Sequence, residues 1–333
     1  MALSKKLAKI IGIGSYLPKK VLSNNDLEKM VDTSDEWIMS RTGIKERRLA
    51  KEDEFTSDMG CEAAKTAIKD ANVENSDIDC IIVATLTPDY IFPSTACLIQ
   101  KKLNITDVPA FDLQAACSGY IYALSVAKSF IENGTYKNIL VIAAEKLSSI
   151  VNYKDRATCI LFGDGAVASV ISLEGKGLEI KGVSLGADGS QANLLMLPAG
   201  GSRHPATEET VKKQMHYLQM AGNEVFKHAV RRMENASKDC LKKVGMKETE
   251  ISYLIPHQAN LRIIEAIAKR FRHLSEDRVY KDVVRKYGNT SASSIGIALD
   301  ELNKKQNIKK GENILLTAFG AGLTWAAAIL TQE

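Results

Sequence analysis

The stretch Asp77-Ile-Asp-Cys-Ile-Ile82 is matched later in the chain by Glu250-Ile-Ser-Tyr-Leu-Ile255. A second pair, Lys137-Asn-Ile-Leu-Val141 and Glu312-Asn-Ile-Leu-Leu316, is separated by nearly the same number of residues. All four segments are short, apolar runs of the kind that forms buried strands. The common separation predicts two similar halves that contain the same order of elements.

Between these strands the chain shows helical patterns, and the alternation is typical of βαβ units and parallel sheets. We therefore expect an α/β fold with one half in residues 1–174 and the other in residues 175–333. The halves are expected to join where Ser172, Gly175 and Gly177 loosen the chain. Chance similarity between any two α/β segments is the competing explanation, and only the shared separation argues against it.

The longest loop-like stretch runs from Gly186 to Thr210 and contains Gly200-Gly201 and Pro205. Glycine and proline in such numbers interrupt both helices and strands. Long loops of this kind in compact domains are usually functional. We expect this stretch to cover a site.

The composition excludes several classes of protein. The 333 residues are 45% hydrophobic and 25% charged, which is ordinary for globular proteins. A net charge of +4 is too small for a general binder of nucleic acids or membrane surfaces. The longest apolar runs, such as Ile139–Ala144, are far shorter than the roughly 18 residues of a spanning helix. We expect no nucleic-acid partner and no membrane segment.

The cysteines indicate the compartment. Six of them lie at wide, irregular intervals without a C-x-x-C pair: Cys61, Cys80, Cys97, Cys117, Cys159 and Cys240. This spacing argues against a disulfide framework and against a zinc site. The sequence thus predicts reduced thiols, no bound metal and a cytoplasmic location.

Cys117 differs from the other cysteines in its surroundings, Phe111-Asp-Leu-Gln-Ala-Ala-Cys-Ser-Gly-Tyr120. The pattern predicts a strand, a turn of small residues and then a helix that ends at Asn133-Gly134. A sulfur at the N-terminus of a helix is stabilised as the thiolate by unpaired N–H groups and by the macrodipole. A buried structural cysteine is the alternative, and it is the interpretation we favour for the other five.

Two more residues follow predicted strands in the same way. His257 lies in Ile255-Pro-His-Gln-Ala-Asn260, and Asn289 lies in Tyr287-Gly-Asn-Thr-Ser-Ala-Ser-Ser294. Functional groups of α/β proteins concentrate at such strand ends. A hydrogen-bonded loop histidine and a helix-capping asparagine are the alternatives. Cysteine, histidine and asparagine occur in this order in papain-like proteases too, but the flanking residues of that family are absent.

The sequence closely resembles β-ketoacyl-acyl-carrier-protein synthase III, the initiating condensing enzyme of bacterial fatty acid synthesis in the thiolase-fold superfamily. The resemblance covers nearly the whole chain. It includes the motifs Ser34-Asp-Glu-Trp-Ile38, Arg41-Thr-Gly-Ile44, Ala115-Ala-Cys-Ser-Gly119, Phe162-Gly-Asp-Gly-Ala166, Met220-Ala-Gly-Asn-Glu-Val-Phe226, His257-Gln-Ala-Asn260, Gly288-Asn-Thr-Ser291 and Phe319-Gly-Ala-Gly-Leu-Thr-Trp325. It implies two similar halves in a layered αβαβα core. The combination of Cys117, His257 and Asn289 fits this branch better than degradative thiolases or elongating synthases.

The resemblance also implies a reaction. Cys117 would take an acyl group from a CoA thioester, with acetyl-CoA expected, while the N–H groups of Cys117 and Ala321 form the oxyanion hole. His257 and Asn289 would then hold the thioester oxygen of malonyl-acyl-carrier protein as carbon dioxide leaves. Many relatives have glycine where Ala321 stands, which raises the question of the backbone conformation there. No permanently bound cofactor is expected.

Binding residues follow from the same resemblance. Trp37 and Arg156 would sandwich the CoA adenine, and Thr33, Arg41, Asn223 and Asn260 would also contact CoA. Phe92 would close the primer pocket of the neighbouring subunit in a homodimer. Acyl carrier protein, which is acidic, would contact Lys227, Gln258, Ala259, Asn260, Leu261, Arg262, Lys269 and Arg270. A solvated surface helix is the alternative interpretation of this basic segment.

Three other functions remain open at this point. The same chemistry could serve a quinolone or polyketide starter pathway with a longer or aromatic primer. A cysteine acyl hydrolase would release free acid without a malonyl acceptor. A non-catalytic module that binds carrier protein is disfavoured because all three catalytic positions are present.

Overall fold

The four similar segments of the sequence form two parallel pairs of buried strands. In the computed structural model, which describes residues 6–305 and 308–333, β4 (Cys80–Ala84) lies parallel to β6 (Asn138–Glu145). In the same way β11 (Ile251–Pro256) lies parallel to β12 (Asn313–Gly320). Nearly every residue of these strands is buried, as expected for strands covered on both faces.

The sheet order is nearly symmetric about its centre. Nine strands form one sheet in the order β11-β12-β13-β8-β1-β7-β6-β4-β5. The remaining strands are β1 (Lys9–Tyr16), β5 (Ala110–Leu113), β7 (Gly165–Ser172), β8 (Leu178–Ala187) and β13 (Thr324–Gln332). At the position equivalent to β5, the second half has an isolated parallel bridge between Leu254 and Val279. The two halves of the sheet join through short antiparallel pairing of β1 with β8.

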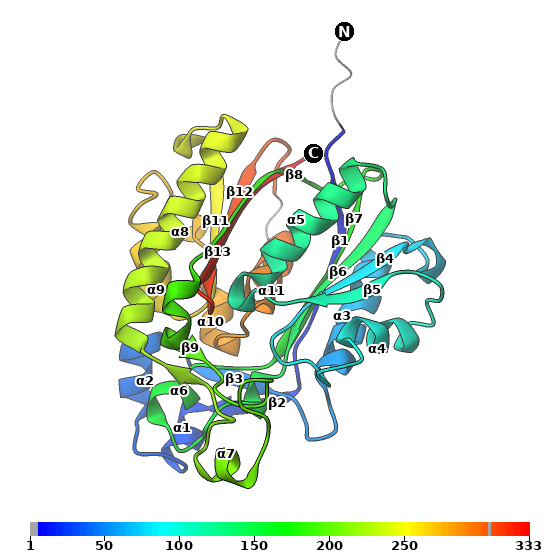
Figure 1. Ribbon diagram of the computed structural model, residues 1–333. Coiled ribbons are helices and arrows are strands. Elements are labelled where there is room, and N and C mark those ends of the chain that lie inside the picture. The colour runs from blue at the N-terminus through cyan, green and yellow to red at the C-terminus, as the bar shows by residue number, and fades with distance from the viewer. Residues whose placement is uncertain (1–5, 306–307) are drawn as a thin grey trace.

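Helices divide the molecule into layers (Figure 1). The helices α3 (Thr56–Asp70) and α4 (Thr95–Lys102) pack on the first half of the sheet, and α8 (Gly222–Val244) packs on β8, β12 and β13. Between them, α5 (Gly119–Glu132) and α11 (Ser293–Lys305) each contact strands of both halves. The layers therefore follow the predicted order αβαβα. The loop between β7 and β8 contains the boundary of residues 1–174 and 175–333, which remain our proposed halves.

The helix after Cys117 forms as its apolar pattern predicts. Ile121, Leu124, Ala127 and Ile131 have no exposed surface, because they face the sheet from the central layer. The helix ends at Asn133, and Gly134 follows with φ of +72°. Such a left-handed residue is the common way to stop a helix.

Smaller elements gather at the end of the molecule that is lowest in Figure 1. They include β2 (Lys20–Ser23) paired with β3 (Glu46–Leu49), and β9 (Leu195–Met196) paired with β10 (Gln219–Met220). Four short helices lie at this end: α1 (Asn24–Glu28), α2 (Asp35–Thr42), α6 (Arg156–Cys159) and α7 (Glu208–Lys212). Two more, α9 (Leu261–Ala268) and α10 (Asp282–Tyr287), lie nearer the middle of the view. Within residues 6–305 and 308–333, none of the helices combines the length and apolar character needed to cross a membrane.

Candidate active site

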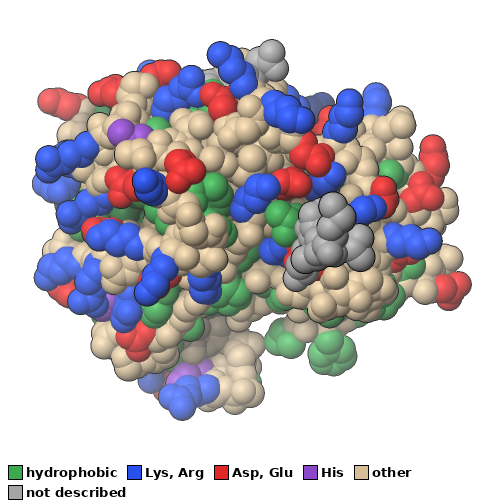
Figure 2. All heavy atoms as spheres, turned by 90° about the horizontal axis from the view of Figure 1, so that it is seen from above, with side chains coloured by type: hydrophobic (Ala, Val, Ile, Leu, Met, Phe, Trp, Pro, Cys, Tyr) green, Lys and Arg blue, Asp and Glu red, His purple; other side chains and the backbone are tan. Residues whose placement is uncertain are grey.

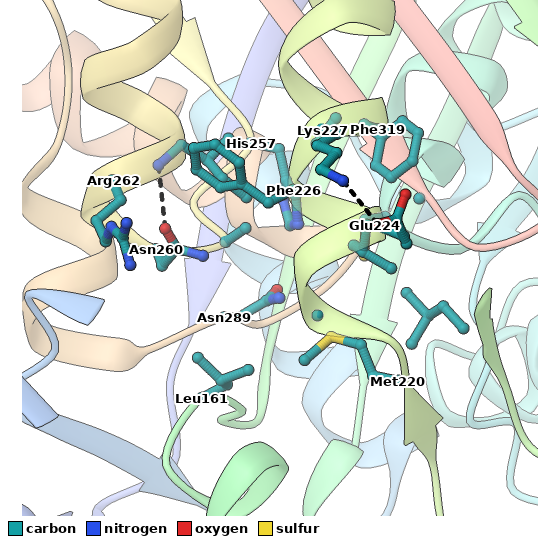
Figure 3. Close-up of a pocket in the computed structure, with 18 of the residues that line it drawn as sticks. Leu161, Met220, Glu224, Phe226, Lys227, His257, Asn260, Arg262, Asn289 and Phe319 are labelled. Carbon is teal, nitrogen blue, oxygen red and sulfur yellow. Dashed lines mark hydrogen bonds and ion pairs between the residues drawn. The ribbon is translucent and has the colours of Figure 1, made fainter. Parts of the chain in front are cut away.

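Cys117, His257 and Asn289 line one pocket of about 570 Å³. Cys117 lies in the short turn before α5, and His257 follows β11. Asn289 lies between α10 and α11, so the strand predicted before Asn289 is wrong. Figure 3 shows His257 and Asn289 around this pocket, with Phe226 and Phe319 beside them. Residues that are far apart in the sequence therefore meet where the two halves face each other.

The Cys117 thiol lies at the predicted strand-to-helix turn, but it is buried. Its side chain is only 8% exposed, and Ala116 before it adopts a φ of +45°. Burial raises the pKa of the Cys117 thiol to about 12, although the Ser291 hydroxyl and the N–H of Cys117 itself act in the opposite direction. The sequence predicts a lowered pKa from the helix N-terminus, and this expectation is wrong because desolvation dominates.

A serine hydroxyl lies within hydrogen-bond distance of the His257 ring. The Nδ1 of His257 lies 2.7 Å from Ser294 Oγ, and the same oxygen accepts a hydrogen bond from the N–H of Gln258 at 3.3 Å. When Ser294 donates its own proton to Nδ1, the imidazole proton lies on Nε2. Burial lowers the pKa of His257 to about 3, so the ring is neutral at pH 7. A neutral Nε2–H is a hydrogen-bond donor.

The Asn289 amide is oriented by its own turn. Its Oδ1 accepts a hydrogen bond from the N–H of Ser291 at 2.9 Å, so the amide NH₂ is the group left for other partners. The backbone of Asn289 is fixed as well, since its N–H donates to the carbonyl of Leu161 and its own carbonyl accepts from Gly163. Two neutral donors, from His257 and Asn289, thus border the pocket that contains Cys117.

The hairpin between β12 and β13 lies against the backbone of Cys117. Thr324 Oγ1 donates to the carbonyl of Ala115 at 2.9 Å. A Cβ on Gly320 would come within 2.7 Å of the Cys117 nitrogen. Ala321 is not among the residues with positive φ, and the unusual conformation falls on Gly322 with φ of +132°. The alanine at position 321 therefore does not strain the turn.

A second pocket of about 620 Å³ also reaches Cys117, and it is mainly apolar. Its apolar lining includes Leu86, Ile91, Leu147, Ile150, Phe162, Leu195, Leu197 and Leu218. The segment Leu195–Gly201 forms part of this wall, which agrees with the prediction that residues 186–210 cover a site. Sequence reasoning missed most of these residues, since single leucines from separate loops carry no pattern.

The six residues predicted for CoA lie in two places. Arg41, Asn223 and Asn260 line the pocket of Cys117, His257 and Asn289, whereas Thr33, Trp37 and Arg156 lie outside it. The Arg156 guanidinium carbon is 4.8 Å from the centre of the Trp37 ring. A ring stacked between them would need roughly 7 Å. A sandwiched adenine therefore requires Arg156 to move.

The residues predicted for the carrier protein lie mostly on the surface between α8 and α9. A groove of about 480 Å³ is lined there by Arg262, Lys269 and Arg270, together with Arg272, which sequence reasoning missed. The sequence predicts an apolar stripe of Leu261, Ile264, Ala268 and Phe271 for this helix, and this prediction is partly wrong. The buried residues of α9 are Ile263, Ile264 and Ile267, and the helix ends at Ala268. Lys269 and Arg270 therefore extend from the turn beyond it.

Several of the predicted contacts have other partners in the chain. Gln258 is fully buried, donates to the carbonyls of Pro256 and Tyr280, and accepts from the N–H of Val284. We therefore remove Gln258 from the predicted docking surface. Lys227 is paired with Glu224 at 2.8 Å, as the dashed line in Figure 3 marks. Asn260 caps α9 through its Oδ1.

Phe92 extends from the surface of the chain. It is 84% exposed, and its neighbours Tyr90 and Ile91 are 61% and 83% exposed. Three consecutive exposed apolar residues are unusual for a monomer surface.

In the part of the chain that the structure describes, no group of His, Cys, Asp or Glu side chains is arranged to hold a metal ion.

Known proteins match the chain over its whole length. Residues 111–189 match the family model for 3-oxoacyl-[acyl-carrier-protein] synthase III, and residues 241–332 match the model for its C-terminal part. The chain is 59% identical to the β-ketoacyl-[acyl-carrier-protein] synthase III of Chlamydia muridarum, covering 98% of this chain and 99% of that protein. The corresponding protein of Caldanaerobacter subterraneus is 56% identical, with 98% of each chain covered.

A solved structure agrees with these sequence matches. The crystal structure of 3-oxoacyl-[acyl-carrier-protein] synthase III from Aquifex aeolicus is similar with a TM-score of 0.88 and 51% sequence identity. The match covers 97% of this chain and 99% of that one. The fold predicted from the sequence is thereby confirmed.

Proposed function

The chain belongs to the 3-oxoacyl-[acyl-carrier-protein] synthase III family, and we propose from this membership that it joins an acyl-CoA primer to malonyl-acyl-carrier protein. The products are 3-oxoacyl-acyl-carrier protein, CoA and carbon dioxide, and the reaction initiates fatty acid synthesis. The protein is thus an acyltransferase. The observation that carries the proposed mechanism is the common pocket of Cys117, His257 and Asn289.

In the first half-reaction Cys117 accepts the acyl group. Its sulfur attacks the thioester carbon of the primer, for which we propose acetyl-CoA, and CoA leaves. The N–H groups of Cys117 and Ala321 are the proposed donors to the oxyanion. The contact of the β12–β13 hairpin with the Cys117 backbone supports this pairing, because it brings Ala321 to the same pocket wall. N–H donors that are already in position lower the activation barrier, because they stabilise the negative charge that develops on the thioester oxygen in a site that excludes water.

In the second half-reaction His257 and Asn289 act on the malonyl thioester. Negative charge develops on the thioester oxygen as carbon dioxide leaves, and two neutral donors suit that oxygen. The orientation of both side chains supports this role. Ser294 leaves the imidazole proton of His257 on Nε2, and the N–H of Ser291 leaves the Asn289 NH₂ free to donate.

We assign the substrate channel to two groups of residues. Asn223 and Asn260 contact the pantetheine arm within the catalytic pocket. Trp37 and Arg156 bind the adenine, with Thr33 and Arg41 nearby. The stacking of Arg156 on Trp37 supports a role as an aromatic platform that opens for adenine. The apolar pocket on the other side of Cys117 holds the acyl chain of the primer.

The functional unit in this proposal is a homodimer in the cytoplasm. Phe92 of one subunit closes the primer pocket of the other, which accounts for its exposure in the single chain. Five of the six free cysteines are buried, which suits reduced thiols. No permanently bound cofactor takes part in the proposed reaction.

Acyl carrier protein docks on the surface between α8 and α9. We define this docking surface by Lys227, Ala259, Asn260, Leu261, Arg262, Lys269 and Arg270. Arg262, Lys269, Arg270 and Arg272 line the groove on this surface. Figure 2, which views the molecule from above, shows many Lys and Arg side chains on the side that carries α8, with acidic side chains among them. Arg270 is paired with Glu234 and Lys227 with Glu224, so each carboxylate partly neutralises the positive charge beside it. Arg262 and Lys269 are therefore the main source of positive charge on the docking surface.

The two half-reactions can be tested separately. After incubation with acetyl-CoA, intact-protein and peptide mass spectrometry should find one acetyl group on Cys117, and Cys117→Ala should carry none. His257→Ala should still be acetylated but should condense with malonyl-acyl-carrier protein about 10²- to 10³-fold more slowly. Absence of the acetyl adduct from the wild-type protein would contradict the mechanism. Release of free acetate without a malonyl acceptor would instead indicate a hydrolase.

A further inference from the structure

A fully buried arginine lies behind the segment that holds Asn289, and the mechanism so far does not use it. Arg47 belongs to β3 and has no exposed surface. Its guanidinium donates to the Oδ1 of Asn24 at 2.6 Å and to the carbonyl of Ile160. Its Nε is buried and makes no hydrogen bond with the described residues. Burying a guanidinium against two neutral acceptors is costly, so this arginine calls for an explanation.

The carbonyl that Arg47 holds belongs to the segment that fixes the backbone of Asn289. The N–H of Asn289 donates to the carbonyl of Leu161 at 2.8 Å, and the carbonyl of Asn289 accepts from the N–H of Gly163 at 3.1 Å. These bonds form an isolated parallel bridge between Phe162 and Asn289. We call residues 160–163 the bridge segment. Arg47 therefore binds its first residue, directly before the part that holds Asn289.

The aliphatic part of Arg47 packs on both sides of the same bridge. A Cβ added to Gly163 would lie 3.2 Å from the Cβ of Arg47, and one added to Gly288 would lie 3.2 Å from its Cγ. Gly163 ends the bridge segment, and Gly288 directly precedes Asn289. The stem of Arg47 thus supports the bridge segment and the Asn289 turn together.

The other acceptor of Arg47 is itself held firmly. Asn24 is 2% exposed, and its amide donates to the Oδ1 of Asp35 at 2.7 Å and to the carbonyl of Ile44 at 2.8 Å. These two bonds direct the Oδ1 of Asn24 to Arg47. Asn24 begins α1 and Asp35 begins α2, so the guanidinium is anchored to both helices. Arg47 therefore connects a fixed anchor to the bridge segment.

The position of the Asn289 amide depends on this backbone support. The side chain of Asn289 is short, and its Oδ1 is already bound to the N–H of Ser291. The direction of the amide NH₂ is thus set within the turn, whereas the place of the whole turn is set by the bridge segment. A displacement of about 1 Å at a reacting group can slow a reaction by about 10²-fold.

We propose that Arg47 is a positioning residue for the condensation step. It holds the bridge segment, and with it the backbone of Asn289, where the amide can donate to the oxygen of the malonyl thioester. The proposal rests on the proposed role of Asn289 in that half-reaction. Arg47 has no exposed surface and does not line the catalytic pocket, so it acts only through Asn289. Acetylation of Cys117 does not use the Asn289 amide and is independent of Arg47.

Separate single-turnover assays of the two half-reactions test the proposal. Arg47→Met keeps an apolar stem of similar length but removes both hydrogen bonds. Starting from acetylated enzyme and saturating malonyl-acyl-carrier protein, condensation should be about 10-fold slower than in the wild-type protein. Acetylation at saturating acetyl-CoA should stay within about twofold of the wild-type rate. Arg47→Lys keeps the stem, the charge and one donor, and it should recover part of the lost rate.

A double-mutant cycle with Asn289→Ala separates positioning from a general structural role. In the Asn289→Ala background, Arg47→Met should not slow condensation further, because the amide through which Arg47 acts is already absent. Arg278→Met is the matched control for loss of a packed, hydrogen-bonded arginine. Arg278 lies over the ring of Tyr253 and pairs with Glu312 at 3.0 Å, but it does not line the catalytic pocket. This control should keep both rates.

The outcomes distinguish the role of Arg47 from the proposed function. A wild-type rate of condensation in Arg47→Met, an equal loss in acetylation and condensation, or additive losses in the cycle would each overturn the proposal and leave the function intact. Should Arg47→Met fail to fold, Arg47→Lys takes its place in the same cycle. If the wild-type acetyl-enzyme does not condense with malonyl-acyl-carrier protein, the proposed function itself fails.

Discussion

Each reacting side chain of the site is oriented by one polar neighbour. Ser294 Oγ lies 2.7 Å from the Nδ1 of His257, and the N–H of Ser291 donates to the Oδ1 of Asn289. These neighbours sit in the turn that begins α11, so a single turn controls both donors to the thioester oxygen. Groups that hold a catalytic residue in this way commonly affect rates by one to two orders of magnitude.

Replacing Ser294 by alanine should slow condensation without affecting acetylation of Cys117. The Nδ1 of His257 then loses its partner, and the tautomer with the proton on Nε2 is no longer favoured. We expect condensation to fall about 10-fold, less than in His257→Ala, in a single-turnover assay that starts from the acetylated enzyme. Ser294→Thr, which keeps the hydroxyl, should restore most of the rate. An equal loss in acetylation and condensation would show a general disturbance of the site instead.

The buried, neutral His257 also makes stability depend on pH. An unfolded chain binds a proton at this histidine below pH 6.5, whereas the native pKa is lowered to about 3. Protonation of His257 in the unfolded chain therefore does not reduce the free energy of unfolding above pH 6.5. As the pH falls from 6.5 toward 3, this protonation lowers the free energy of unfolding by at most about 1.4 kcal/mol per pH unit. Glu145 has the opposite effect on the free energy of unfolding. Its raised pKa lets the native state hold an extra proton up to about pH 7, so this group stabilises the native state as the pH falls.

His257→Gln should thus change the slope of stability with pH. Between pH 6.5 and 4.5 the variant should lose less free energy of unfolding than the wild-type protein, since it has no histidine to protonate on unfolding. Urea denaturation at several pH values in this range measures the difference. Parallel curves for the two proteins would show that His257 is not neutral in the native state.

The hairpin of β12 and β13 sets the shape of the site at the level of elements. Its turn contacts the backbone of Cys117 at Gly320 and binds the carbonyl of Ala115 through Thr324. Backbone atoms of the hairpin therefore pack directly against the backbone of Cys117. Glycine at position 320 is required by this close approach.

Gly320→Ala should impair acetylation of Cys117 while the protein still folds. The added Cβ would approach the Cys117 nitrogen to 2.7 Å, so the hairpin and the nucleophile turn must separate. A shift of this kind displaces the oxyanion donors, and we expect at least a 10-fold slower acetylation. Gly189→Ala is the control, because a Cβ there meets nothing within 4 Å. Unimpaired acetylation in Gly320→Ala would mean that the hairpin does not shape the oxyanion hole.

At the scale of the whole molecule, charge is distributed unevenly although the net charge is only +4. The docking surface concentrates positive side chains near the mouth of the catalytic pocket, where Arg262 lines both the pocket and the adjacent groove. Such a patch attracts an acidic partner and orients it, mainly by raising the association rate.

Lys269→Glu should weaken use of the acyl-carrier-protein substrate selectively. We expect the KM for malonyl-acyl-carrier protein to rise about fivefold at low salt, and the difference to shrink as ionic strength increases. Acetylation by acetyl-CoA should be unchanged, because Lys269 does not line the catalytic pocket. Lys20→Glu on β2 is the control for a change of net charge, and it should leave this KM unaltered. A similar effect of both variants would argue against a local docking surface.

Four of the strands, the helix after Cys117 and three residues that line one pocket could be predicted from the sequence. The repeated apolar segments predicted β4, β6, β11 and β12, and the stripe after Cys117 predicted α5 with its end. These features depend on local periodicity and on turn residues, which neighbouring positions in the chain encode. The predicted stripe of α9 was partly wrong because the helix ends at Ala268 and buries Ile263 and Ile267 beside Ile264.

The way these parts contact each other depends on the three-dimensional packing of the chain. The buried state of Cys117, the second apolar pocket and the enclosure of Gln258 depend on segments that are distant in the sequence. The same holds for the contact of Gly320 with the backbone of Cys117. Burial and proton affinity are set by what packs around a group from every side, and no local pattern of residues records that.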